Sequence, residues 1–183
     1  MVFRKLTTLT PIRLSHILLK EKLMAETPFI IYEQQFQRIK TVLVRLCIES
    51  AARVVFLIDR DGQPIAVHGD LGEMDTTSFA SLAAGNVAAT SSMAKLIGED
   101  SFPTLAHEGE HENIYISVIG RSLLVVVFDG RSTLGLVKLR SKKASYEVAE
   151  ILEQIAKSSE EHALEENSFF SEISDDEIDS LFS

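Results

Sequence analysis

Two segments of the chain repeat their hydrophobic residues at helical spacing, one near the start and one near the end. The apolar positions of the first segment, 31–50, are Phe36, Ile39, Leu43, Leu46 and Cys47. The second repeat begins near Ser132 and runs through Leu134, Val137, Ser141, Ala144, Val148, Ile151 and Ile155. Steps of three and four residues predict a helix that buries one stripe. In the first helix, Cys47 is then a small core residue. In the last helix, the three lysines fall outside the apolar stripe and are expected on the solvent side: Lys138, Lys142 and Lys143.

Five shorter segments have the length and composition of β-strands. They are 52–60, 64–69, 102–109, 113–120 and 123–130. Asp61 and Gly62 join the first two as a tight hairpin, because both residues tolerate the positive φ that such turns need. The run LLVVVF in the last strand is unbroken, which predicts burial on both faces. The predicted order of elements is α-β-β-α-β-β-β-α.

The helix predicted between Asp75 and Gly98 has a face built from small residues. Asp75 suits the N-cap and Gly98 the C-terminal end of this helix. The small residues at helical spacing are Ser81, Gly85, Ala88 and Ser92, and a separate apolar side is formed by Leu82, Ala89, Met93 and Leu96. Missing side-chain volume must be filled by something, so the small face packs either on the protein's own sheet or on a second chain.

Charge is unevenly distributed along the chain, whose net charge is −9. Residues 1–23 carry five Lys and Arg against one Glu, whereas residues 159–183 carry nine acidic residues and no basic one. Such an acidic tail repels phosphate backbones, which argues against nucleic acid as a partner. The basic run KLRSKK at 138–143 is interpreted as a solvated helix face.

A length of 183 residues with 45% hydrophobic content favours one domain and a tail. The predicted boundaries are a basic N-terminal extension at 1–30, a folded domain at 31–158 and an acidic tail at 159–183. Met24 is a plausible alternative start, so the first 23 residues are interpreted as a start-site artefact or a disordered extension. One cysteine and no signal peptide favour the reducing cytoplasm, and no apolar run reaches the length of a membrane span.

Several short patterns resemble catalytic motifs, but their context argues against each one. The segment from His107 to His111 reads HEGEH, which satisfies the zinc-protease pattern only on a helix, whereas here it lies between two predicted strands. Ser92 and Lys95 match a Ser-x-x-Lys pattern whose companion motifs are missing, and His68 is a lone residue at a strand end. No phosphate-binding Gly-x-x-x-x-Gly-Lys sequence occurs. The sequence therefore predicts no catalytic residue, cofactor or metal site.

Four blocks of the sequence together form a long pattern. They are ARVVFLIDRDGQPIA at 52–66, DTTSFASLAAGNVAATSSMAKLIGEDSFP at 75–103, LLVVVFDGRSTLGLVKLRSKKAS at 123–145 and FSEISDDEIDSLF at 170–182. In this order the blocks resemble the roadblock family, and within it the MglB-type bacterial regulators of the Ras-like GTPase MglA. The resemblance implies an α/β (α+β) roadblock fold with a central five-stranded antiparallel sheet and a flexible C-terminal tail.

The resemblance also implies a function. Such a regulator is a homodimer, in which the second helices and third strands of two subunits meet, and it stimulates GTP hydrolysis by a GTP-bound MglA-like GTPase. It holds the GTPase's own switch residues without inserting an arginine finger. The implied GTPase-binding residues are Ser81, Gly85, Ala88, Ser92 and Lys95. Arg121 and Arg131 are exposed-looking turn residues, interpreted as capping or solvated rather than as fingers.

The acidic tail carries a second predicted contact. Residues 158–169 are polar and are interpreted as a linker. In ISDDEIDSLF at 173–182, Ser174 and Glu177 form a capping box. The resulting short helix would present Ile173, Ile178, Leu181 and Phe182. The resemblance implies binding to the same GTPase, and the peptide also resembles one that binds a receiver domain. The alternative is a solubilising end.

Two other functions remain open from the sequence. A roadblock-fold scaffold would dock a GTPase or polar proteins without accelerating hydrolysis, and it would need the same helix face. A hydrolase is the more distant alternative. The resemblance places the regulator in cell polarity and gliding motility, in the cytoplasm and with a cell pole as a site of action.

Overall fold

The computed structural model describes residues 33–172, and it describes side chains for residues 33–159. The predicted N-terminal extension and the predicted short helix after Ser174 lie outside this range. The elements follow the predicted order: α2 (Glu33–Glu49), β1 (Val54–Asp59), β2 (Pro64–Gly69), α3 (Thr76–Leu96), β3 (Thr104–Glu108), β4 (Glu112–Ile119), β5 (Ser122–Asp129) and α4 (Leu134–Glu172). The predicted α-β-β-α-β-β-β-α order is therefore confirmed.

The five strands form one antiparallel sheet in the order β2-β1-β5-β4-β3. β5 lies at its centre, and every residue from Ser122 to Phe128 is buried, which confirms the prediction of burial on both faces. The hairpin between β1 and β2 turns at Gly62, whose φ is +84°, in the left-handed region that glycine adopts without a Cβ penalty.

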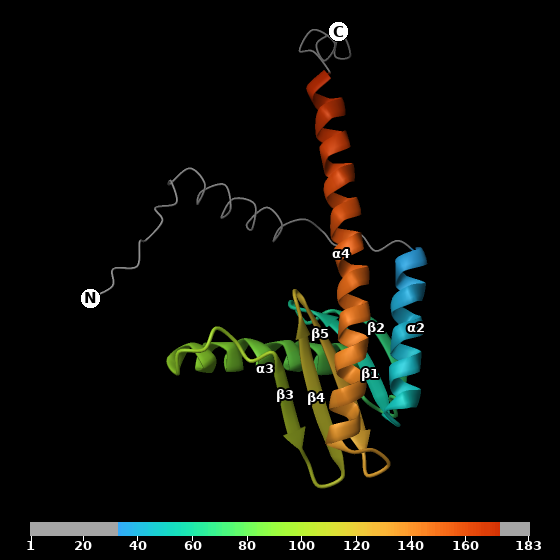
Figure 1. Ribbon diagram of the computed structural model, residues 1–183, viewed down its shortest axis with the longest axis vertical. Helices are drawn as coiled ribbons and strands as arrows, with labels where there is room; N and C mark the ends of the chain where they lie inside the picture. The colour runs from blue at the N-terminus through green and yellow to red at the C-terminus, as the bar shows by residue number, and fades with distance from the viewer. Residues whose placement is uncertain (1–32, 173–183) are drawn as a thin grey trace, which may run out of the picture. The chain divides into compact units, whose positions relative to one another are not determined.

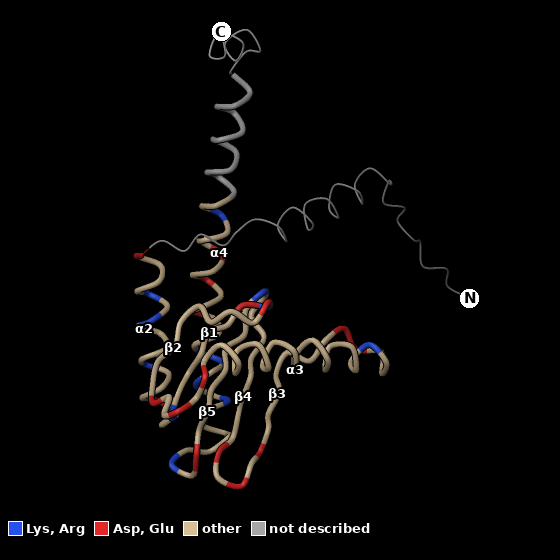
Figure 2. The backbone as a smooth tube through the Cα atoms, turned by 180° about the vertical axis from the view of Figure 1, so that it is seen from behind, with Lys and Arg blue, Asp and Glu red and all other residues tan. Residues whose placement is uncertain are grey.

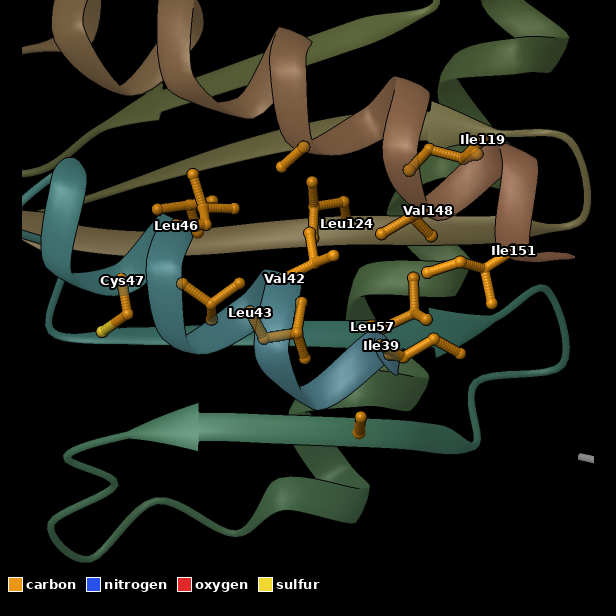
Figure 3. Packing of buried hydrophobic residues seen from close by; sticks show 14 of the residues in the cluster. Ile39, Val42, Leu43, Leu46, Cys47, Leu57, Ile119, Leu124, Val148 and Ile151 are labelled. Atoms are coloured by element: carbon orange, nitrogen blue, oxygen red, sulfur yellow. The ribbon is translucent and has the colours of Figure 1, made fainter. Parts of the chain in front are cut away.

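Helices cover both faces of the sheet, and they do so in two separate layers (Figure 1). Successive side chains of a strand point to opposite faces. Val55 and Leu57 of β1 accordingly pack in the cluster formed by α2 and α4, whereas Val54 and Phe56 pack in the cluster formed by α3. Figure 3 shows the first cluster, in which Leu43 of α2 and Val148 of α4 meet Leu124 of β5, with Cys47 inside the core as predicted.

Ion pairs and one hydrogen bond fasten α2 to α4. Arg45 pairs with Glu147, Arg140 pairs with Glu49 at 3.2 Å, and Arg38 Nη1 donates to Gln154 Oε1 at 2.6 Å. Residues later in α2 contact residues earlier in α4, so the two helices are antiparallel. The contacts fix which side of α4 faces the domain and which side faces solvent.

The linker predicted at 158–169 is not observed, because α4 continues as one helix of 39 residues to Glu172. This segment reads SSEEHALEENSF and contains neither Gly nor Pro. Its Glu, Ala and Leu residues are good helix formers, and extending an existing helix avoids the cost of nucleating a new one. The polar composition was therefore a poor guide to local structure. None of the described helices is long and apolar enough to cross a membrane.

Candidate partner-binding surface on α3

α3 begins and ends where the sequence predicts. The side chain of Asp75 accepts hydrogen bonds from Thr77 N at 3.1 Å and from Ser78 Oγ at 2.6 Å. These bonds, above all the one from Ser78, hold the pKa of the Asp75 carboxyl below its ordinary value. At the other end Gly98 takes a φ of +82°, and Glu99 N donates to Ala94 O at 3.0 Å.

Small residues on the inner side bring α3 close to the sheet. The buried residues of the helix are Ala80, Ala83, Ala84, Val87 and Ala94. They pack against strand residues such as Phe56 and Val125 in one cluster. Phe79 adds a ring contact with Phe56, with centroids 4.8 Å apart. Alanines thus do the packing that larger residues perform in α2 and α4.

The predicted small face points away from the sheet. Ser81, Gly85, Ala88 and Ser92 are all exposed, and a Cβ placed on Gly85 would meet nothing within 4 Å. The N-terminal end of this face lies against the β1–β2 turn, since a Cβ on Gly62 would approach Ser81 Cα to 2.7 Å. Of the two explanations given by the sequence, packing on the protein's own sheet is wrong for these four residues. Their small size leaves room for something outside the chain.

The apolar side of α3 is also exposed. Leu82 is 74% exposed, Met93 60% and Leu96 87%, and Ala89 is exposed as well. At about 100° per residue, this side adjoins the small face around the helix. Figure 2 shows α3 largely free of charge along its length, since Lys95 is its single charged residue. α3 therefore presents one broad uncharged surface.

The C-terminal part of α3 reaches beyond the edge of the sheet. In Figures 1 and 2, seen from opposite sides, this end of the helix extends past β3. Within the described sheet β3 pairs with β4 alone, and most of its residues are exposed. The uncovered helix end and the unpaired strand edge lie on the same side of the molecule.

Lys95, the last predicted contact residue, lies at a cavity of about 300 Å³ beside the small face. Ala88 lines the same cavity, together with Arg60 from the turn after β1 and Asp100 from the loop after α3. Sequence reasoning missed Arg60 and Asp100. Arg60 reaches the site only because the fold places the turn after β1 against α3, which its local sequence does not indicate. Asp100 follows the end of α3 by four residues.

The structure also tests the short patterns that resembled catalytic motifs. His107 lies in β3, and His111 lies in the turn before β4, so HEGEH forms a hairpin rather than the helix a zinc protease needs. Within residues 33–159 no group of three His, Cys, Asp or Glu side chains is placed to hold a metal ion. Arg131 pairs with Asp129 at 3.0 Å, while Arg121 O accepts from Arg60 N at 3.0 Å.

The four predicted tail contacts, Ile173, Ile178, Leu181 and Phe182, lie outside the described residues. The site that the structure brings together is thus confined to α3 and its surroundings.

A five-stranded antiparallel sheet with α3 on one face and two helices on the other is the arrangement of roadblock proteins, and the comparisons with known proteins agree. The Roadblock/LC7 domain family matches residues 38–128. The comparison with curated proteins gives no match.

Among solved structures, Myxococcus xanthus MglB is 50% identical, with a TM-score of 0.65, and the match covers 69% of this chain and 96% of that one. The gliding protein MglB of Thermus thermophilus is 38% identical with a TM-score of 0.67, covering 70% and 98%. An MglB with a tetrameric arrangement is 36% identical with a TM-score of 0.67, covering 71% and 98%. The chain belongs to the Roadblock/LC7 family and, within it, to the MglB proteins.

Proposed function

We propose that this chain is a homodimeric regulator that binds an MglA-like Ras-family GTPase in its GTP-bound form and accelerates GTP hydrolysis. The observation that carries the proposal is α3, which packs its inner side with alanines and leaves its small and apolar faces uncovered. The proposed setting is the cytoplasm, at a cell pole, in the control of polarity and gliding motility.

The apolar side of α3 suits the contact between two copies of the chain. Exposed Leu82, Met93 and Leu96 lie on a helix whose end projects past the unpaired edge of β3. A second copy related by a two-fold axis would bring the same apolar side and the same strand edge into contact, since such an interface is self-complementary. Removal of this apolar area from water would favour the dimer.

The small face suits the GTPase. Ser81, Gly85, Ala88 and Ser92 adjoin the apolar side without coinciding with it, so both contacts can form on one helix. Lys95 and the neighbouring cavity extend this contact toward the end of α3. Since the sequence has no phosphate-binding loop of its own, the chain would act by holding the GTPase's switch residues in place. Positioning and electrostatics account for most of the catalysis in phosphoryl transfer, so such an indirect role suffices.

Ala88→Arg tests the GTPase contact. An arginine on the small face overpacks any close approach, so we expect the affinity for the GTP-bound GTPase to fall at least about tenfold, or about 1.4 kcal/mol, with stimulated hydrolysis lost in parallel. The measurement is binding and single-turnover GTP hydrolysis. Gln34→Arg is the matched control, because it adds the same charge to an exposed position of α2.

Unchanged affinity of the Ala88→Arg variant would remove α3 as the GTPase site. A wild-type complex that forms on GTP without faster hydrolysis would instead identify the chain as a scaffold.

Leu82→Glu tests the dimer contact. A carboxylate introduced on the apolar side would have to be desolvated in the interface, so we expect sedimentation equilibrium to shift from twice the mass of one chain to a single mass. Ile48→Glu is the matched control, since Ile48 is 72% exposed on α2 and should leave the dimer intact. A dimer that survives Leu82→Glu would place the interface elsewhere.

A further inference from the structure

The outer side of α4 carries a second exposed surface, on the opposite layer from α3. Leu139 and Tyr146 are each 64% exposed, and at about 100° per residue they fall within about 60° of Lys142 around the helix. Lys138 and Lys143 lie on either side of these three residues around the helix, and all three lysines are exposed. These five residues form the basic α4 face. It combines two apolar side chains with three positive charges.

The charges of the basic α4 face are not used within the described part of the domain. Other charged residues of α4 are paired with α2, as Arg140 is with Glu49 and Glu147 with Arg45. No ion pair joins Lys138, Lys142 or Lys143 to any residue whose side chain the structure describes. Three like charges on neighbouring turns repel one another, so an acidic partner would relieve this repulsion.

The chain itself contains a segment of matching composition. Residues 173–183 read ISDDEIDSLFS, with four acidic residues and no basic one. Ile178, Leu181 and Phe182 are spaced three and four residues apart, and acidic residues lie beside them. This combination of acidic and apolar residues complements the lysines, Leu139 and Tyr146.

The segment cannot reach the basic α4 face of its own chain. Tyr146 precedes the end of α4 at Glu172 by 26 residues, or about 39 Å at 1.5 Å per residue. From Glu172 to Phe182, the far end of the apolar residues in the segment, even a fully extended chain spans only about 36 Å, so it falls short of Tyr146 and still further short of Leu139. We therefore propose that the basic α4 face binds residues 173–182 of a second copy of the chain. This inference is independent of GTPase binding through α3.

Disulfide cross-linking between two full-length variants tests the contact. The chain's own thiol, Cys47, is buried, so new cysteines would react selectively. A Tyr146→Cys chain, enlarged by a tag, is mixed with a Phe182→Cys chain and oxidised. The control pair is Gln34→Cys with Phe182→Cys, because Gln34 is likewise exposed to solvent but lies on α2, outside the basic α4 face. We expect the yield of the mixed disulfide with Tyr146→Cys to exceed that of the control pair about tenfold.

Charge reversal shows whether the lysines carry the binding. Adding Lys142→Glu and Lys143→Glu to the Tyr146→Cys chain should lower the mixed product about tenfold. Adding Asp175→Lys and Asp176→Lys to the other chain should restore it. Product that is insensitive to both reversals would overturn the proposal, because the lysines would then not be what binds the acidic segment. Equal yields for the Tyr146→Cys and Gln34→Cys pairs would also overturn it.

A single chain carrying both Tyr146→Cys and Phe182→Cys separates the two modes of docking. When it is diluted, an internal disulfide without change of mass would contradict docking between copies. The expected result is a disulfide whose yield falls with dilution.

Discussion

Individual small residues of α3 have two different roles. Ala80, Ala83 and Ala84 are buried and let the helix lie close to the sheet, which is a requirement of dense packing. Gly85 and Ala88 are exposed and serve no packing within the described domain. Residue type alone does not separate these roles, since alanine occurs in both sets. What separates them is the angular position around the helix, which the sheet defines.

Two glycine substitutions should have opposite effects. Gly62→Ala places a side chain at a φ of +84° and 2.7 Å from Ser81 Cα, so we expect a loss of about 1–3 kcal/mol in the free energy of unfolding. Gly85→Ala adds a methyl group to open space in a helix interior and should stabilise by about 0.5–1 kcal/mol. Urea unfolding of both variants is the measurement. A destabilised Gly85→Ala protein would mean that this position is covered.

At the scale of elements, the predicted order and types of helices and strands are confirmed. The prediction was wrong about where the last helix, α4, ends. Period and turn chemistry identified every helix and strand of residues 33–172, because tertiary packing there agrees with local pattern. The length of α4 was missed because polar composition was interpreted as a linker. For the candidate site, the sequence identified the small face of α3. Arg60 could not be predicted, since it reaches the cavity through tertiary structure, and Asp100 was missed although it lies only four residues after α3.

The N-cap of α3 predicts a dependence of stability on pH. The pKa of Asp75 is lowered from 3.8 in the folded state, chiefly by the bond from Ser78. Its carboxylate therefore stabilises the fold above its ordinary pKa, and this contribution disappears as the pH falls through the lower folded value. Asp75→Asn keeps a capping oxygen but does not titrate. We expect wild type to lose stability more steeply than Asp75→Asn below about pH 4.

Urea midpoints across the acidic range measure this difference. Ser78→Ala provides the control, because it removes the main cause of the shift and should weaken the pH dependence without abolishing it. Parallel pH profiles for wild type and Asp75→Asn would contradict the assignment of the cap.

At the scale of the whole molecule, two exposed surfaces lie on opposite layers of one sheet. The α3 surface is uncharged over most of its length, and the basic α4 face is cationic. Occupation of one surface would therefore leave the other accessible to a partner of different chemistry. The domain boundary at 158 and the acidic tail from 159 stay predictions, although α4 runs through that boundary.

The arrangement of arginines predicts that neither Arg121 nor Arg131 acts as a finger. They lie beyond the two ends of β5, a strand whose seven steps from Ser122 to Asp129 span about 24 Å, so they cannot serve one γ-phosphate together. Arg131 is also held by Asp129 at 3.0 Å. We expect Arg121→Ala and Arg131→Ala to keep GTPase stimulation within about twofold of wild type. Loss of a finger would instead lower the rate about 10³-fold or more. Single-turnover GTP hydrolysis at saturating regulator distinguishes the two, and a collapse of the rate with intact binding would show that an arginine of this chain enters the GTPase site.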